Sequence, residues 1–290
     1  IASLSWRLKK GMFLLVMLNL HGYSKEGNAL YQIHLVKAST ARAFIPKEFR
    51  LVEAFGYKQA STGYTLGGFF LASYDDSPAG VFDELVMIAG IVWNPPTSCA
   101  WAARVLVNSN EACHHGRKEV GLPSQFARFS KVIPKRKRER AFGFLDTFGL
   151  GTTLSHPEDL MEVKVSEVDS AASANICNIQ IRSDELETKL GKWMGPAIKM
   201  SLPSFSGNTK FNPNLLKYSC HIHCRVRPVS PAVVSKPLED EADKNHTSQE
   251  SLENERRLSV AVMLSKPIIA LQFKDLTMQV EAPVVVHPSV

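Results

Sequence analysis

The sequence predicts a mainly β protein whose antiparallel sheet closes into a barrel or a sandwich. Three observations favour this fold class. Apolar and polar residues alternate with a period of two in many segments, helix signals are few, and strand and helix patterns do not follow one another regularly. Pro, Gly and Asn separate about ten candidate strands. At 290 residues, of which 44% are hydrophobic, the chain can bury a substantial core.

The first 26 residues are set apart from this fold. Three basic residues between positions 7 and 10 precede a short apolar run over 12–18, an arrangement like the start of a signal peptide. The run is too short to cross a membrane, and secretion is not expected. We therefore predict one domain over residues 27–290, without a transmembrane segment.

Helices are expected in few places. The segment "KASTARAF" (37–44) predicts a short helix capped by Ser39 or Thr40 and ended by Pro46. Short helical turns are expected after Ser124 and near Glu185. Residues 235–255 are polar and acidic and have few large apolar groups, so they predict a disordered loop between strands.

Two kinds of strand are expected. The stretches "YTLGGFFLASY" (64–74) and "ELVMIAGIVW" (84–93) are apolar throughout and typical of strands buried on both faces. The others alternate and predict half-buried strands: "MEVKVSEV" (161–168), "CNIQIR" (177–182), "LKYSCHIHCRVR" (216–227) and "TMQVEA" (277–282).

The charge distribution argues against a nucleic-acid-binding protein. The formal net charge is +6, but residues 131–140 hold six basic side chains, whereas residues 238–255 hold seven acidic ones. A solvated hairpin or loop accounts for the basic run. The five cysteines include no Cys-x-x-Cys pair, which favours a reducing compartment and no disulfide framework.

Neither a metal site nor a cofactor site is predicted. In the strand 216–227 the two cysteines face one side and the two histidines the other, so the four side chains cannot converge on one ion. In "CHHG" (113–116) the same alternation applies if the segment is the end of a strand. The Gly-x-Gly of "FGLGTTL" (148–154) lacks the third glycine and the acidic partner of a dinucleotide-binding loop.

Asp83 and Glu84 are the candidate acid–base residues. They open a run that is otherwise apolar for nine residues. A carboxyl group carried into such a strand loses water, which raises its pKa and suits general acid or base catalysis. The alternative is an exposed, inert pair at the mouth of a strand.

Three segments resemble the acetoacetate decarboxylase family. "GVFDEL" (80–85) matches its glycine, aromatic residue and glutamate. "GRKEVGLPS" (116–124) matches its Gly-Arg, spacer and proline, and "ALYQIHLVKASTARAFIPKEFRLVE" (29–53) is similar to its first strand and helix. The resemblance implies a closed, double-layered antiparallel β cone around an apolar cavity, and assembly into homo-oligomers.

The resemblance also implies a loss of chemistry. The decarboxylases attack their substrate with a lysine that directly follows the motif proline, whereas this chain has Ser124 there, followed by Gln125. Neither side chain can form a Schiff base, so decarboxylation by that route is not expected. Arg117, Ser124 and Gln125 are the expected ligand-binding residues: Arg117 is expected to orient Glu84 or to bind a ligand oxygen, and Ser124 to donate a hydrogen bond.

A closer resemblance, to a plant branch of the family, covers about residues 29–286 apart from an extra heptapeptide, "KQASTGY" (58–64). It implies a role in forming neoxanthin from violaxanthin, a xanthophyll step upstream of abscisic acid and part of a chloroplast pathway. No transit peptide is visible, so the compartment stays open.

Two hypotheses follow from these observations. In the first, the protein binds an apolar, carotenoid-derived ligand or assists the xanthophyll-converting enzyme, without catalysing a reaction itself. In the second, it is a cofactor-free isomerase that opens an epoxide and removes a proton, with Glu84 as acid or base and Asp83 as the weaker candidate.

Overall fold

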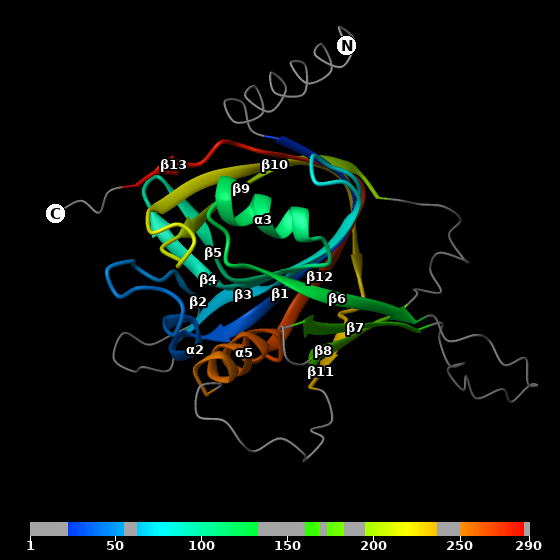
Figure 1. Ribbon diagram of the computed structural model, residues 1–290, viewed down its shortest axis with the longest axis horizontal. Coiled ribbons are helices and arrows are strands. Elements are labelled where there is room, and N and C mark those ends of the chain that lie inside the picture. The colour runs from blue at the N-terminus through cyan, green and yellow to red at the C-terminus, as the bar shows by residue number, and fades with distance from the viewer. Residues whose placement is uncertain are drawn as a thin grey trace, which may run out of the picture.

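Seven strands close into a barrel in the computed structural model, which describes residues 23–54, 63–132, 160–168, 173–182, 195–236 and 250–286 (Figure 1). Around the barrel they are β5 (Thr97–Val107), β4 (Phe82–Asn94), β3 (Tyr64–Asp76), β1 (Tyr23–Lys37), β12 (Lys266–Val280), β10 (Leu215–Val229) and β9 (Ala197–Gly207). Parallel pairing of β9 with β5 closes the ring. The predicted mainly β, closed architecture is confirmed, but the sheet is mixed and not wholly antiparallel.

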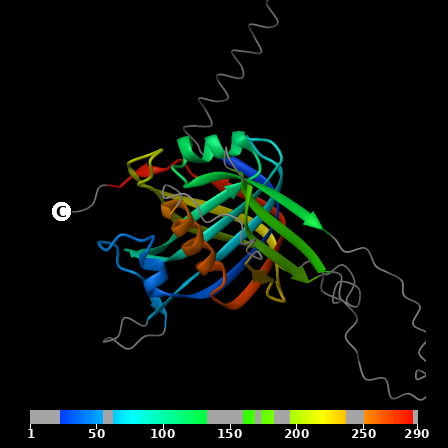
Figure 2. The same cartoon turned by 60° about the horizontal axis from the view of Figure 1, so that its bottom comes forward.

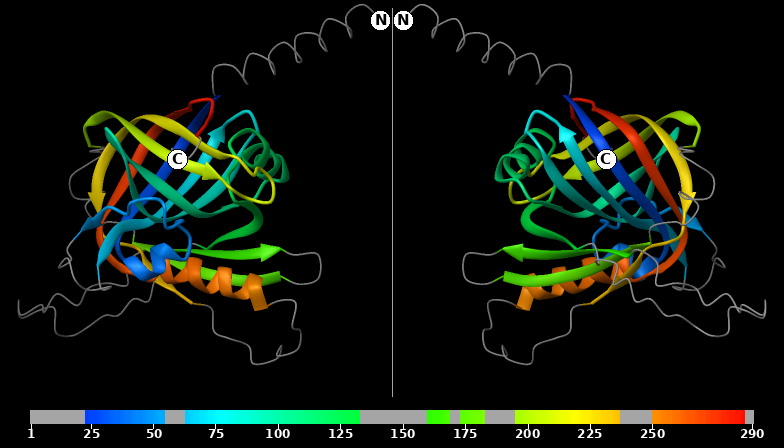
Figure 3. Two further views of the ribbon diagram at one scale, coloured as in Figure 1. Left: turned by 90° about the vertical axis from the view of Figure 1, so that its left-hand side faces the viewer. Right: turned by 90° about the vertical axis from the view of Figure 1, so that its right-hand side faces the viewer.

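A second layer of strands covers part of the barrel's outer face. It consists of β6 (Ser124–Val132), β7 (Leu160–Val168), β8 (Ser173–Arg182) and β11 (Val233–Ser235), and it continues from β5 through a parallel β5–β6 pair. Figure 2 shows these strands projecting from the barrel. Helix α5 (Glu250–Met263) packs beside them (Figure 3). The shorter elements are β2 (Glu53–Ala54), β13 (Val284–Val285), α2 (Ala38–Arg42) and α3 (Asn110–Glu119).

The period of two decides which side chains enter the barrel. In β4, Phe82 and Val86 face the interior, whereas Leu85 and Met87 belong to the core between the two layers. The apolar runs predicted to be buried on both faces are therefore the strands that separate these two cores. A third cluster, around Trp101 and Phe205, fills the end of the barrel near α2.

Four local predictions are wrong. Lys37, not Ser39 or Thr40, precedes the first turn of α2, and its side chain makes no capping hydrogen bond. No helical turn follows Ser124, because residues 124–126 pair with β5 as the start of β6. Residues 113–116 lie in helix α3 and not at the end of a strand. The side chain of Ser109 caps that helix by accepting a hydrogen bond from the Ala112 amide.

The fourth error concerns the loop expected at 235–255. Ser235 ends strand β11, and from residue 250 the chain forms α5, whose later turns bury Val260, Val262 and Met263. The first turns of this helix are polar, so the sequence pattern there favoured a loop although the last turns are amphipathic. Residues 237–249 lie outside the described residues, as do Glu185, 148–154, 58–62 and 133–140.

The boundary set at residue 26 is also wrong. Tyr23–Glu26 form the first part of β1 and pair with β12, and Glu26 also pairs with β3. These residues therefore belong to the barrel. No helix in the described ranges is long and apolar enough to span a membrane.

A buried histidine joins β1 to α5. His34 is 1% exposed, and its Nδ1 lies 3.2 Å from the Val262 carbonyl oxygen. Its Nε2 lies 2.9 Å from Nε2 of Gln32, whose amide also donates to the Ala232 carbonyl oxygen. A neutral ring with the proton on Nδ1 satisfies all these groups. Burial lowers the pKa of His34, against a smaller upward effect of its bond to Val262.

Stability should therefore fall in acid. The folded protein holds His34 neutral, whereas the same side chain in the unfolded chain binds a proton once the pH drops below about 6.5. Each further pH unit of acidification then lowers the free energy of unfolding by at most about 1.4 kcal/mol through this group. Urea unfolding between pH 7.5 and 5 should show a steeper loss for the native chain than for His34→Gln. Equal slopes would contradict this. His223→Gln, on the exposed face of β10, serves as the control.

Candidate functional site

The interior of the barrel holds a cavity of about 320 Å³. Its wall is largely apolar and aromatic and includes Phe70, Val86, Ile88, Ile91, Leu122, Tyr31 and Met278. Charged side chains enter it at one place, where β1, β3 and β4 lie side by side. This combination of an apolar wall and a few convergent polar groups is typical of small-molecule sites.

Glu84 is the centre of the polar cluster. It is 6% exposed, although it carries a carboxyl group. Its Oε2 accepts a hydrogen bond of 2.8 Å from the Tyr74 hydroxyl and lies 3.2 Å from Nζ of Lys25, while its Oε1 lies 3.4 Å from the same nitrogen. The pairing of β3 with β4 positions two of these groups, since Ala72 and Tyr74 of β3 pair with Glu84 and Phe82 of β4; Lys25 comes from β1, on the other side of β3.

Three aromatic rings surround the ammonium group of Lys25. Its Nζ lies 4.4 Å from the ring centre of Tyr74, 5.1 Å from that of Phe82 and 5.8 Å from that of Tyr23. Lys25 is itself 6% exposed. Cation–π attraction and the ion pair with Glu84 together offset the cost of burying this charge.

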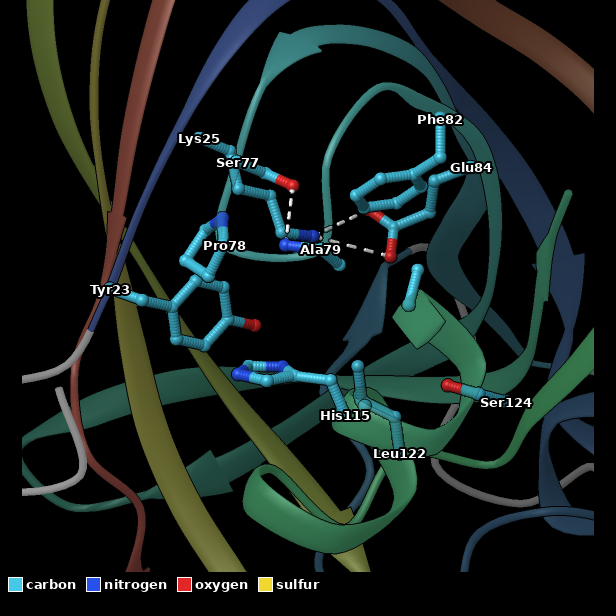
Figure 4. Close-up of a pocket in the computed structure, with 12 residues that line it drawn as sticks. Tyr23, Lys25, Ser77, Pro78, Ala79, Phe82, Glu84, His115, Leu122 and Ser124 are labelled. Atoms are coloured by element: carbon cyan, nitrogen blue, oxygen red, sulfur yellow. Dashed lines mark hydrogen bonds and ion pairs between the residues drawn. The ribbon is translucent and has the colours of Figure 1, made fainter. Parts of the chain in front are cut away.

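A second, smaller pocket lies on the other side of the ion pair (Figure 4). The turn Ser77–Ala79, His115 and Ser124 line it, and it shares Tyr23, Lys25, Glu84 and Leu122 with the barrel cavity. The His115 ring packs edge-on against Tyr23, with centroids 4.7 Å apart. Burial, more than any neighbouring charge, lowers the pKa of His115.

The other ionisable groups of the cavity are held neutral. Burial raises the pKa of Tyr23, Tyr74 and Tyr218 well above the usual value, and the nearby Glu84 adds to this. Burial also raises the pKa of the Cys220 thiol to about 12. The phenols are therefore hydrogen-bond donors at neutral pH, and the thiol is not a nucleophile.

The structure brings together two of the five predicted site residues, Glu84 and Ser124. Ser124 is fully buried at the start of β6 and lines the smaller pocket. Helix α3 lies close to it because Gly116 has no side chain: a Cβ there would stand 2.7 Å from the Ser124 hydroxyl oxygen. This close approach explains why the sequence motif has a glycine at position 116.

Asp83, Arg117 and Gln125 do not line the cavity. Asp83 faces outward and pairs with Lys131 at 2.5 Å. Arg117 donates from Nε to the Ser124 carbonyl oxygen at 2.7 Å and stacks on Phe211, so it fixes the start of β6 and does not contact Glu84. Gln125 accepts from Arg104 between the two layers of strands.

Sequence reasoning missed Lys25, Tyr74 and Tyr23. The alternation that turns Ala29 and Tyr31 inward extends back to Lys25 and Tyr23, and this was the available signal. Tyr74 follows the same rule on β3. In the described part of the chain no three His, Cys, Asp or Glu side chains are grouped to hold a metal ion.

The chain is similar in sequence to three plant proteins that share one name, although no family model matches it. It is 81% identical over 280 residues to an Arabidopsis thaliana protein named NEOXANTHIN-DEFICIENT 1, covering 92% of this chain and 96% of that protein. Proteins of the same name from Solanum lycopersicum and Oryza sativa subsp. japonica are 57% and 53% identical; the alignments cover 91% of this chain in both cases, and 94% and 88% of those proteins.

Two solved structures share the fold at low identity. One is an acetoacetate decarboxylase, with a TM-score of 0.50 and 9% identity, covering 92% of this chain and 89% of that one. The other is the enduracididine biosynthesis enzyme MppR in complex with pyruvate, with a TM-score of 0.51 and 10% identity, covering 92% and 90%. Both show that the fold is of the acetoacetate decarboxylase type.

Proposed function

The chain belongs to the plant NEOXANTHIN-DEFICIENT 1 family, and on that premise we propose that it acts in forming neoxanthin from violaxanthin by binding a xanthophyll end group in its barrel. The relatives' shared name supports a role connected with neoxanthin. The observation that carries the binding proposal is the cavity of about 320 Å³, whose wall is largely apolar and whose charged side chains are those of Lys25 and Glu84. Such a wall suits a methylated ring that carries one or two oxygen atoms.

Size limits what can enter the barrel. A whole carotenoid is roughly 30 Å long, about the thickness of a bilayer core. The cavity holds one cyclic end group, so the polyene chain would have to leave through its mouth. This form of binding presents the opposite end of the ligand to another protein, which suits an accessory role beside the xanthophyll-converting enzyme.

Filling the cavity should weaken this binding. Ala100 lines the cavity, and Ala100→Phe adds a ring inside it. We expect the affinity for violaxanthin to fall at least about tenfold, because the displaced end group loses its buried apolar contacts. The absorption shift of violaxanthin on titration with protein measures this. Val81→Phe places the same ring at a position that is 74% exposed and should leave binding unchanged; equal affinities for both variants would contradict the proposal.

A second candidate function is the isomerase itself, and the contacts of Glu84 favour it. The conversion breaks one C–O bond of the epoxide, removes one proton from carbon and adds one to the released oxygen, so it needs no cofactor. Glu84 would accept the proton as the base. Lys25 and Tyr74, both in contact with its Oε2, are donors that could protonate the oxygen. Schiff-base decarboxylation is not proposed, because Ser124 and Gln125 lack an amine and the Lys25 amine is paired with Glu84.

One experiment separates the two candidates. Purified protein is incubated with violaxanthin, alone or with a plastid extract from plants that lack the protein, and neoxanthin is measured by chromatography. Product from protein and violaxanthin alone supports the isomerase. Product only when extract is also present supports the accessory role, and no effect in either mixture would reject both.

A further inference from the structure

Lys25 has hydrogen-bonding capacity beyond its ion pair. An ammonium group carries three N–H donors and no acceptor. Among the described residues, the hydrogen-bond partners of Lys25 are the two oxygens of Glu84, at 3.2 and 3.4 Å. The remaining surroundings of Nζ are the faces of Tyr23, Tyr74 and Phe82 and the two spaces on either side of it.

Lys25 is also the one cationic side chain that lines the barrel cavity in the described part of the chain. Its third N–H donor favours a ligand that supplies an oxygen atom near Nζ, because a buried donor without an acceptor costs free energy. The carboxylate of Glu84 beside it repels an anionic ligand. The favoured ligand oxygen is therefore neutral and an acceptor.

We propose that Lys25 is the specificity-determining residue of the cavity and selects ring ligands that carry an ether-type oxygen, an epoxide above all. An epoxide oxygen accepts hydrogen bonds and cannot donate, which complements a group that only donates. The surrounding aromatic rings exclude water and strengthen the bond. This inference rests on the proposed function, since it names the chemical feature by which the same cavity recognises an end group.

The test compares two small ring compounds that differ by a single oxygen atom, β-ionone and its 5,6-epoxide. Isothermal titration calorimetry gives the affinity of the folded, full-length protein for each. We expect the epoxide to bind the native protein about tenfold more tightly, as a hydrogen bond from a charged donor implies. In Lys25→Met the two affinities should become equal, while the affinity for β-ionone changes by less than about threefold.

The matched control is Lys131→Met. Lys131 also pairs with a carboxylate, that of Asp83, but on the outer face of the barrel, so this variant should keep the tenfold preference. Lys25→Gln retains an N–H donor and should keep part of the preference, and it replaces Lys25→Met if that variant does not fold.

Each outcome bears on the proposal. Equal binding of both compounds to the native protein, or a preference that persists in Lys25→Met, overturns the role of Lys25 and leaves the cavity as a binding site. If neither compound binds, the cavity proposal fails together with the inference. Preference in the native protein and in Lys131→Met, with its loss in Lys25→Met, supports it.

Discussion

Replacing Glu84 with glutamine is expected to abolish the restoration of neoxanthin when the variant is returned to a plant line that lacks this protein. Glutamine keeps the length of the side chain and an oxygen that Tyr74 and Lys25 can still bond. It removes the negative charge and any ability to accept a proton. For an isomerase, losing the base should lower the rate at least about a hundredfold. For a binding protein, the substitution would leave the positive charge of Lys25 in the cavity without its counter-charge, and ligand binding should weaken.

The neighbouring carboxylate provides the control. Asp83→Asn changes the same chemical group one position earlier in β4, where the side chain faces outward and pairs with Lys131. Neoxanthin, measured in leaf extracts, should be normal with Asp83→Asn and absent with Glu84→Gln, at matched protein levels. Normal neoxanthin with Glu84→Gln would remove Glu84 from both candidate functions.

The contrast between these two carboxylates shows what the sequence could and could not predict. An Asp-Glu pair at the start of an apolar strand indicates that one of the two enters the core, because adjacent residues of a strand face opposite sides. It does not say which side is the cavity. That depends on the register of β3 and β4, which places Glu84 beside Ala72 and within reach of Tyr74.

Lys25 was missed for a different reason. Its segment was separated from the fold because of the basic and apolar residues before it, although the alternation in β1 continues through it. The partner of Glu84 is 59 residues away in the chain, and the two meet because β3 alone separates β1 from β4 in the sheet, a strand order that no local pattern shows. The helix α3 was misread because extended geometry was assumed for "CHHG", whereas the cap at Ser109 begins a helix there.

The largest effect on stability is expected from Glu167→Ala. Glu167 of β7 accepts a hydrogen bond of 2.7 Å from Nη2 of Arg104 on β5, and its other oxygen lies 2.9 Å from Nη2 of Arg256 on α5. Arg104 is 5% exposed, and its Nη1 has no hydrogen-bond partner among the described residues. Burial lowers the pKa of Arg104, against the upward effect of Glu167. Arg104, Glu167 and Arg256 form a network in which one buried donor of Arg104 already lacks an acceptor among the described residues.

Removing the carboxylate leaves a buried guanidinium without its counter-charge, which costs about 3–5 kcal/mol. Urea unfolding followed by circular dichroism should show this loss for Glu167→Ala. The double variant Arg104→Met with Glu167→Ala should recover most of it, because both charges are then absent. Glu281→Ala breaks the exposed pair with His221 and should cost about 0.5 kcal/mol or less. A loss below about 1 kcal/mol for Glu167→Ala would contradict a structural role of the pair.

The position of this network also determines where the structure should loosen. Arg104 belongs to the barrel, Glu167 to the second layer and Arg256 to α5, so the ion pairs of Glu167 link three parts of the fold, in addition to the apolar contacts between them. In Glu167→Ala, amide hydrogen exchange should rise in β7 and β8, because Glu167 lies on β7 and β8 is paired with it, while β1, β3 and β12 hold none of the three residues of the network and should keep their protection. The cavity lies inside the protected strands. At a temperature where Glu167→Ala is still folded, the variant should therefore keep its affinity for the epoxide. That result would show that the second layer contributes to stability independently of ligand binding at Lys25 and Glu84.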